Sequence, residues 1–357
     1  MSRKDDHVNH ALDQFAGRRK PAEGQKGQPG RTDFDDVSFV HHSLRSIDVS
    51  SVDLSTRIGR LELHTPFFIN AMTGGTEWTR SINEKLAEVA RRTGLAMAVG
   101  SMSAAMKDES LLDTFTVVRE INPDGIVFAN LNPNYSSRDA LYAIEKMKAD
   151  AIQIHVNAPQ EIVMGEGDRS FSHWSENIRS IAESSPVDVI VKEVGFGMSR
   201  ETIAELISLG SGIIDVSGKG GTNFAKIESD RHEDRKMAYL NDWGLSTVQS
   251  LLEAHEYRDT ADLIASGGIR HPLDFAKAYA LGARAVGMSG PFLSAVMNEG
   301  VEATVQMVEE WKQELRLIMA LAGSSTVLGL RNSDLVLSAE LLHYCVQRDI
   351  RMARAED

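Results

Sequence analysis

Short apolar runs recur along the middle of the chain, and each is separated from the next by a stretch long enough for a helix. Eight of these runs have the length of buried strands. They occupy residues 67–70, 95–101, 126–131, 151–156, 188–193, 213–217, 262–268 and 285–290. The intervals between them place apolar residues at helical spacing, over 77–92, 108–120, 137–148, 173–183, 199–209, 245–255 and 271–281. Buried strands that alternate with helices predict an α/β fold with a parallel sheet, and eight strands favour a closed (β/α)8 TIM barrel over an open doubly wound sheet.

Two extensions flank this pattern. Near the N-terminus, helical spacing is shown by Val8, Ala11, Leu12 and Phe15. The residues that follow, 17–33, are rich in Gly, Pro and Lys and predict a flexible link. At the other end, residues 300–350 look helical.

One connection, from Gly218 to Trp243, is too long for an ordinary βα loop, which indicates a functional loop. From these features we expect residues 1–36 to form a helix and link that close over a site. We expect residues 37–357 to form a single barrel domain with a long loop at 218–244 and C-terminal helices.

Composition excludes several kinds of partner. The chain of 357 residues carries 38 Lys and Arg against 51 Asp and Glu, so its formal net charge is −13. A protein this acidic is a poor binder of polyanions, and we expect no nucleic-acid partner. No apolar run reaches the length of a membrane span, and the charged N-terminus lacks the apolar region of a secretory signal. Cys345 is the single cysteine, which excludes an intrachain disulfide and predicts a cytoplasmic protein.

Each predicted strand carries polar residues at its C-terminal end, where barrel enzymes hold their active sites. In strand order they are Asn70 and Thr73, Ser101, Asn130, His155 and Asn157, Lys192, Asp215 and Ser217, Ser266, and Ser289. A barrel with a purely structural role has no need of such a ring. The ring therefore indicates a polar ligand bound over the barrel.

The fourth strand shows which way its polar residues point. Gln153, His155 and Asn157 share one face, and the apolar residues between them share the other. Because the apolar face packs against helices, the polar face points into the barrel. On the next strand, Lys192 carries an ammonium that is costly to bury unless it meets an anion or an electron-rich ligand. Escape of Lys192 to solvent is the alternative.

Glycine turns follow the last two strands, at 266–268 and 289–291. The loops after strands seven and eight of barrels commonly bind phosphate, because glycine lets backbone N–H groups approach the oxygens. Tight turns without a ligand are the alternative interpretation. A third glycine-rich turn, Gly218–Phe224, offers Lys219, Thr222 and Asn223 as candidate anion contacts.

Two further groups of polar residues suit a phosphorylated substrate. Gln160 and Glu161 follow the fourth strand, and a single carboxylate suits Mg²⁺, which keeps waters and bridges to phosphate. A solvated loop acid is the alternative for Glu161. At the N-terminus, Arg3, Lys4 and His7 either close over an anionic substrate or form a solvated charge run.

Several segments, in their order and spacing, resemble the type 2 isopentenyl-diphosphate isomerases, a flavin-dependent family. The resemblance runs from Arg3 to about Gly290. It is carried by RKDDH (3–7), AMTGG (71–75), VGS (99–101), QIHVNAPQE (153–161), EGDR (166–169), VKEVGFGMS (191–199), DVSGKGGTNFAKIE (215–228), DWG (242–244) and SGGIR (266–270). Met102 and Ser103 stand where the family often has Gln-Arg, and Gly165 stands where it has Pro.

The resemblance implies a barrel that holds FMN non-covalently, requires Mg²⁺ and is reduced by NADPH. The implied FMN contacts are Ala71, Met72, Thr73, Ser101, Asn130, Lys192, Ser217, Thr222, Gly267, Gly268, Ser289 and Gly290. The implied contacts of a small diphosphate substrate are Arg3, Lys4, His7, Ser101, His155, Asn157 and Gln160. Glu161 is the implied Mg²⁺ ligand.

The implied activity is the interconversion of isopentenyl and dimethylallyl diphosphate in isoprenoid biosynthesis, by a 1,3-allylic proton shift. No pair of carboxylates stands at a spacing that identifies an acid/base couple, which fits proton chemistry performed by reduced FMN. In this interpretation Gln160, His155 and Asn157 are the catalytic residues beside the flavin. The family also implies a homo-oligomer, a tetramer or an octamer. The alternative function is an FMN-dependent barrel oxidoreductase of the hydroxy-acid oxidase or dehydrogenase kind.

Overall fold

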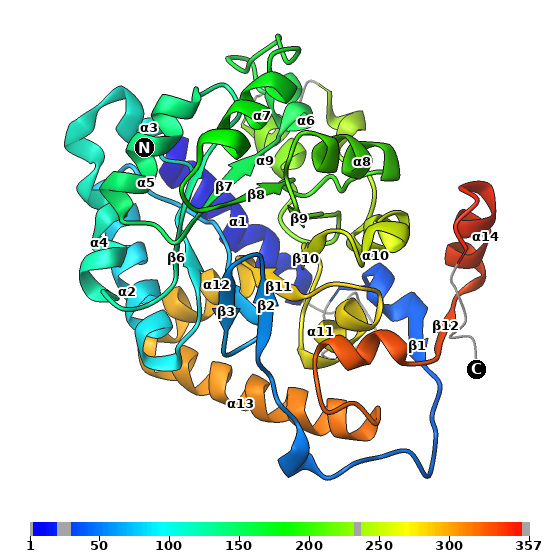
Figure 1. The fold of residues 1–357 in the computed structure, drawn as a ribbon. Helices are drawn as coiled ribbons and strands as arrows, with labels where there is room; N and C mark the ends of the chain where they lie inside the picture. Colours follow the sequence, from blue (N-terminus) through cyan, green and yellow to red (C-terminus); the bar gives the residue numbers. More distant parts are fainter. Residues whose placement is uncertain (1–2, 20–29, 232–236, 352–357) are drawn as a thin grey trace.

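The computed structural model describes residues 3–19, 30–231 and 237–351, and within the first segment it describes the side chains of residues 4–16. A closed parallel barrel forms the centre of the molecule (Figure 1). In barrel order its strands are β10 (Asp262–Ser266), β11 (Ala285–Met288), β4 (Phe67–Ile69), β5 (Met97–Ala98), β6 (Val127–Leu131), β7 (Ala151–His155), β8 (Asp188–Lys192) and β9 (Ile213–Asp215). The eight predicted strands and the (β/α)8 TIM barrel are therefore confirmed.

Helices cover the outside of the barrel. The predicted ones are α2 (Glu77–Thr93), α4 (Asp113–Ile121), α5 (Ser137–Met147), α7 (Trp174–Ser184), α8 (Arg200–Ser208), α10 (Thr247–Glu253) and α11 (Pro272–Ala280). Ser136 and Ser246 each accept a hydrogen bond from the backbone N–H three residues on, which starts α5 and α10. α4 begins later than predicted, because the Asp108 side chain caps a separate 3₁₀ turn at Glu109–Leu111.

The N-terminal end of the barrel is closed by a hairpin of β2 (Thr56–Ile58) and β3 (Leu61–Leu63). The Gly59 N–H at its tip donates to Asp262 Oδ2 over 2.6 Å, and Gly59 has a φ of +54° that favours glycine. Apolar side chains fill the barrel above the hairpin, among them Phe68, Phe128, Ile190 and Ile264. Apolar side chains close this end of the barrel, and the polar residues of the strands lie at the opposite end.

The N-terminal helix, predicted from residues 8–15, is α1 (Arg3–Arg19). It contacts α2, α9 (Phe224–Asp230) and α12 (Gly290–Asn298). Its last three residues belong to the segment predicted as a flexible link, so the helix is longer than expected. Residues 20–29 of that link lie outside the described residues.

The C-terminal region is helical, as predicted, in α13 (Gly300–Leu321) and α14 (Ala339–Gln347). A short strand, β12 (Leu335–Leu337), separates them and pairs antiparallel with β1 (Val37–Phe39). This pairing was not predicted, because both strands lie outside the repeat of apolar runs and helices and are far apart in the sequence.

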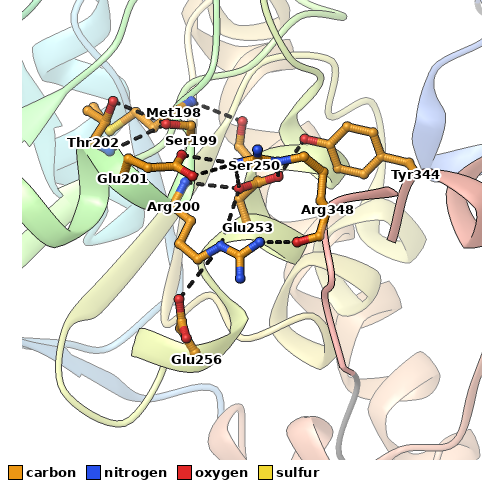
Figure 2. A network of polar contacts seen from close by, with 10 residues as sticks. All are labelled: Met198, Ser199, Arg200, Glu201, Thr202, Ser250, Glu253, Glu256, Tyr344 and Arg348. Atoms are coloured by element: carbon orange, nitrogen blue, oxygen red, sulfur yellow. Dashed lines mark hydrogen bonds and ion pairs between the residues drawn. The ribbon is translucent and has the colours of Figure 1, made fainter. Parts of the chain in front are cut away.

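A polar cluster around Glu253 holds α14 against the barrel, and we call it the Glu253 cluster (Figure 2). Glu253 Oε1 accepts hydrogen bonds of 2.7 Å from both the Tyr344 hydroxyl and Arg348 Nε. Glu253 Oε2 accepts from the backbone N–H of Arg200 over 3.0 Å, and Arg348 also pairs with Glu201. The cluster therefore joins α8, α10 and α14, three helices that are far apart in the sequence.

The long loop after β9 contains α9 and a 3₁₀ turn at Ala238–Leu240, and residues 232–236 of it are outside the described residues. The remaining short elements are α3 (Ser103–Lys107), α6 (Ala158–Val163) and the 3₁₀ turns Asp33–Asp36, Val49–Ser51, His255–Tyr257 and Leu328–Asn332. Among the described helices, none has the length and apolar character required to cross a membrane.

Candidate active site

A cavity of about 1510 Å³ opens at the C-terminal ends of the barrel strands. It is lined by the predicted FMN contacts Ala71, Met72, Thr73, Ser101, Asn130, Lys192, Ser217, Thr222, Gly267, Gly268, Ser289 and Gly290. It is also lined by the predicted substrate contacts Lys4, His7, His155, Asn157 and Gln160 and by Glu161. The side chain of Arg3 lies outside the described residues. Residues that are dispersed over the chain are thus gathered around one space.

The glycine turns after β10 and β11 face the cavity. Gly267 and Gly268 have φ values of +90° and +75°, and a Cβ on Gly267 would lie 2.1 Å from the Gly218 carbonyl oxygen. Glycine is therefore required by the turn itself, whether or not a ligand binds. Gly290 begins α12, so this end of the cavity also has a helix N-terminus. Both turns fit the phosphate end of a nucleotide.

Three residues that line the cavity have a buried side-chain oxygen without a hydrogen-bond partner among the described residues, namely Thr32, Thr73 and Asn157. The most deeply buried of these oxygens are Thr73 Oγ1 and Asn157 Oδ1. Thr73 is 1% exposed and Asn157 is 4% exposed, so bulk solvent does not satisfy them. A buried oxygen without a partner is costly. Both atoms therefore fit a site that is completed by a bound polar ligand such as FMN or a diphosphate.

Two of the candidate anion contacts in the third glycine turn serve the loop instead. Lys219 Nζ donates to the Asp242 carbonyl over 2.9 Å. Asn223 Oδ1 accepts from the Lys226 N–H that starts α9, over 2.9 Å. Neither Lys219 nor Asn223 is among the residues that line the cavity, so the structure does not bring these two candidates to it. Thr222, from the same turn, does line the cavity.

Lys192 is buried at the C-terminal end of β8. Its Nζ donates to the Glu193 carbonyl over 2.6 Å, and its strand neighbour in β9 is Asp215. Burial lowers the pKa of Lys192, and the carboxylates of Asp215 and Glu193 act in the opposite direction. The alternative of a lysine that escapes to solvent is therefore wrong. Its ammonium lies where an electron-rich ligand would meet it.

Glu193 was missed in the sequence, although it lies within the segment VKEVGFGMS. Its Oε2 accepts hydrogen bonds from the backbone N–H groups of Val194, Gly195 and Phe196, over 2.6, 3.0 and 2.7 Å. Burial raises the pKa of Glu193 to about 8, against the effect of these N–H groups and of Lys192. Since Val194 and Gly195 line the cavity, Glu193 shapes its wall from behind.

Gln160 and Glu161 lie on α6 and face the cavity. Glu161 Oε1 accepts from Asn157 Nδ2 over 2.8 Å, and Oε2 accepts from the Asp168 N–H over 2.9 Å. Among the described residues, no three His, Cys, Asp or Glu side chains gather as a metal site. One fixed carboxylate still fits Mg²⁺, because this ion takes most of its ligands from water and phosphate.

Glu228 on α9 is a second residue that sequence reasoning missed. Its Oε1 accepts from Gln160 Nε2 over 3.1 Å and lies 2.8 Å from His7 Nε2, and Arg231 pairs with its other oxygen. Burial raises the pKa of Glu228, but these partners outweigh burial and lower it to about 2. Glu228 thus links the N-terminal helix to Gln160. The only signal in the sequence was its place at the end of DVSGKGGTNFAKIE.

Further contacts hold α1 across the cavity. Gln14 exchanges hydrogen bonds with the backbone of Asn223, over 2.9 and 3.2 Å, and the Thr76 hydroxyl donates to Asp5 over 2.8 Å. Phe15 packs against Gly290, where a Cβ would approach its ring to 3.3 Å. A solvated tail is therefore the wrong interpretation for the described part of this segment (Figure 1).

The three positions that depart from the family pattern lie in different environments. Met102 is fully buried in the core, whereas Ser103 lines the cavity and its hydroxyl lies 2.8 Å from that of Ser101. Gly165 is exposed. The first departure therefore places a small hydroxyl, rather than a long cation, at the edge of the cavity.

Comparison with known proteins agrees with this geometry. Residues 107–337 match the family model described as FMN-dependent dehydrogenase. An isopentenyl-diphosphate delta-isomerase of Staphylococcus epidermidis is 50% identical over 323 residues, which are 90% of this chain and 93% of that protein. The enzyme of the same name from Staphylococcus aureus is 46% identical over 352 residues, or 99% and 97% of the two chains.

Solved structures support the fold alone, because their sequences are distant. A mandelate oxidase in complex with (S)-2-phenylpropionate is 19% identical, with a TM-score of 0.63 over 86% of this chain and 88% of that chain. A variant of mandelate oxidase with a monooxide FMN adduct has a TM-score of 0.64, over 86% and 90%. From the length and identity of the sequence matches, the chain belongs to the type 2 isopentenyl-diphosphate delta-isomerases, within the FMN-dependent dehydrogenase family.

Proposed function

We propose that this protein interconverts isopentenyl and dimethylallyl diphosphate, as a step of isoprenoid biosynthesis, by moving a proton between the two ends of an allyl unit. One observation carries the proposal: relatives with this name are 46–50% identical over 90–99% of the chain. The cavity supports it, because the residues that the resemblance assigns to cofactor and substrate all line it where their side chains are described.

Two parts of the cavity fit a single FMN, one its phosphate and the other its ring. The glycine turns and the start of α12 would hold its phosphate, and the ring would meet Lys192 and the Thr73 hydroxyl, which has no partner among the described residues. When bound and reduced, FMN supplies an electron-rich ring that can give and take a proton and can stabilise a neighbouring cation. NADPH is the proposed reductant. Lys192 would compensate the negative charge of the reduced ring.

The diphosphate would be held at the side of the cavity nearest α1. Lys4 and His7 line this side, and Arg3 precedes them on the same helix. Glu161 would bind a Mg²⁺ ion that bridges to the phosphate oxygens. The pairing of His7 with Glu228 would fix α1 in the closed position, so that residues 1–36 exclude water from the reacting alkene.

Three side chains of the chain itself would act on the alkene and its surroundings. Gln160 is held by Glu228 and would orient the alkene or carry a proton, and Asn157 would keep Glu161 and Gln160 in register. His155, at the end of β7, would complete the wall of the cavity. Their contribution is positioning, which holds the reacting carbon atoms in a reactive geometry.

The test is an anaerobic incubation of the protein with FMN, Mg²⁺, NADPH and isopentenyl diphosphate. We expect dimethylallyl diphosphate to form over many turnovers after NADPH has reduced the flavin once. An oxidoreductase of the hydroxy-acid oxidase kind would instead consume a reductant or substrate stoichiometrically. A protein that forms no dimethylallyl diphosphate under these conditions would contradict the proposal.

The assembly and location of the protein are part of the same proposal. A homo-oligomer, a tetramer or an octamer, is expected from the family, and light scattering at several concentrations tests it. Cys345 is the only cysteine of the chain and is a free, buried thiol, which supports a cytoplasmic location. Fractionation of cells that produce the protein would test that location.

A further inference from the structure

A row of buried side-chain amides runs across the barrel directly beneath the cavity. Asn70, Gln153 and Asn130 come from three different strands or their ends, and the row finishes at His155. The successive hydrogen bonds are 2.9 Å from Gln153 Nε2 to Asn70 Oδ1, 3.0 Å from Asn130 Nδ2 to Gln153 Oε1, and 2.8 Å between Asn130 Oδ1 and His155 Nδ1. We call these three amides the amide relay.

The first member of the relay is fixed from two sides. The backbone N–H of Ala71 donates to Asn70 Oδ1 over 2.8 Å, and Asn70 Nδ2 donates to Asp215 Oδ2 over 2.9 Å. A backbone N–H can only donate, so Asn70 must present its oxygen there. Asp215 is itself held by the Ser266 hydroxyl over 2.7 Å. Asn70 therefore has one allowed orientation.

This orientation is passed along the relay. Since Asn70 presents its oxygen to Gln153, Gln153 must present its NH₂ group there and its oxygen to Asn130. Asn130 must then present its NH₂ group to Gln153 and its oxygen to His155. Turning over any one amide would place two oxygens or two NH₂ groups against each other. Turning over all three would remove these clashes but would place the Asn70 NH₂ group against the Ala71 N–H, and both groups are donors.

We propose that the amide relay fixes the tautomer of His155, with the proton on Nδ1 and with an unprotonated Nε2 turned to the cavity. The inference rests on the proposed function only for the identity of the ligand. An unprotonated Nε2 accepts a hydrogen bond and repels anionic oxygens. The ligand group that His155 takes is therefore an N–H or O–H donor, not an oxygen of the diphosphate.

The neutral state of the ring agrees with its surroundings. Burial, together with the positive charges of Lys192 and Lys4, lowers the pKa of His155 to about 3, against the opposite effect of a hydrogen bond to the Leu131 backbone. A neutral imidazole has one protonated and one free nitrogen, so the partner of Nδ1 decides the role of Nε2.

Gln153 is the positioning residue in this device. It is completely buried and does not line the cavity, so it touches neither cofactor nor substrate. A buried amide is costly unless both of its ends are bonded, and those of Gln153 are bonded to the two other amides. Gly287 leaves the space for this arrangement, because a Cβ there would lie 2.5 Å from Asn70 Nδ2.

The test reads the tautomer directly, by nitrogen NMR on protein in which the 11 histidines carry a nitrogen isotope label. A His155→Asn variant identifies the signals of His155. In the wild-type chain we expect a proton on Nδ1 and none on Nε2, with and without FMN. A proton on Nε2, or on both nitrogens, would overturn the inference, whatever the isomerase assay shows.

Gln153→Met then removes both hydrogen bonds while keeping an unbranched side chain. We expect a second tautomer of His155 to appear and kcat to fall about tenfold, with KM for the diphosphate little changed. If the methionine variant does not fold, Gln153→Glu takes its place. At low pH the neutral carboxylic acid of this variant has one donor and one acceptor, in the same order as the amide. We therefore expect His155 to keep its wild-type tautomer at low pH in this variant. An unchanged tautomer in Gln153→Met would remove Gln153 from its assigned role.

Tyr279→Phe is the matched control. It deletes another buried hydrogen bond, 2.8 Å from the Tyr279 hydroxyl to the Pro66 carbonyl, away from the cavity. In this variant we expect the same His155 tautomer as in the wild type. A shift in this control would show that general destabilisation, not the amide relay, sets the tautomer.

Discussion

The molecule contains two buried polar clusters that use the same kinds of side chain for different ends. In the Glu253 cluster, the carboxylate is bonded by Tyr344, Arg348 and the Arg200 backbone, and it joins three helices outside the barrel (Figure 2). Burial raises the pKa of Glu253, but these partners outweigh it and lower the pKa. The charge of Glu253 is met within the cluster, by groups of the chain itself.

At the cavity the arrangement is different. Among the described residues, Lys192 Nζ donates to the Glu193 carbonyl and Thr73 Oγ1 and Asn157 Oδ1 have no partner, and the glycine turns after β10 and β11 line the same cavity. The two clusters differ in whether their polar groups find partners within the chain. In the Glu253 cluster the buried carboxylate is met by groups of the chain itself and the cluster stabilises the fold, whereas a cluster whose groups are left open toward a cavity needs a ligand to complete them.

The strongest way to break this contrast is to remove Lys192. Lys192→Ala should lower kcat/KM by at least about a hundredfold and weaken flavin retention, because it deletes the cation beside the electron-rich ring. Flavin absorbance after gel filtration and the isomerase assay measure both effects. Lys277→Ala is the control, since Lys277 is also buried but donates to the Phe34 carbonyl outside the cavity. Normal flavin content with full turnover in Lys192→Ala would refute its role.

Glu161→Ala tests the metal side of the cavity. Activity at limiting Mg²⁺ should fall about tenfold, while FMN binding stays intact, because the variant loses a ligand of the metal and not of the flavin. Mg²⁺ titrations of activity and FMN titrations of absorbance separate the two. Glu176→Ala, an exposed acid at the start of α7, should behave as wild type. Activity of Glu161→Ala that is unchanged at low Mg²⁺ would contradict the assignment.

Arg348→Ala should show the opposite behaviour. Loss of its hydrogen bonds to Glu253 should lower the free energy of unfolding by about 2 kcal/mol, with flavin binding and kcat unaffected. Chemical denaturation measures the first and the assay the second. Arg351→Ala is the control, because that side chain is exposed. A stable Arg348→Ala protein with altered kcat would show that the two clusters are not separate in purpose.

The smallest effect concerns pH. The folded protein holds the pKa of His155 at about 3, below its ordinary value of 6.5, so below about 6.5 the unfolded chain binds a proton that the folded chain does not. This contribution to the free energy of unfolding should therefore fall as pH drops from about 6.5 to about 3. Denaturation midpoints of FMN-free protein over this range should fall less steeply for His155→Asn than for wild type. Equal slopes would contradict a neutral, buried imidazole.

Much of the fold could be predicted because its strands and helices repeat with a clear period. The β1–β12 pair could not, since it joins residues 37–39 and 335–337, which lie outside the repeating part of the chain and far apart in the sequence. The polar ends of the strands were readable because parallel strands bring them to one end of the barrel.

Within the site, the hardest residues to predict were those that act by holding another residue in place. Glu228 and Glu193 act through contacts with His7, Gln160 and the turn after β8, which depend on three-dimensional packing. Lys219 does not line the cavity, and its ammonium donates to the Asp242 carbonyl within the same loop, a contact that the sequence could not show. The direction of the amide relay follows only once donors and acceptors are seen together.

A crystal structure of the protein with bound FMN tests the central claim most directly. The account predicts the flavin ring beside Lys192 at the C-terminal ends of the strands, with the phosphate on the backbone N–H groups of Gly267, Gly268 and Gly290. Density for FMN at any other place, or a phosphate that faces away from these two turns, would contradict it.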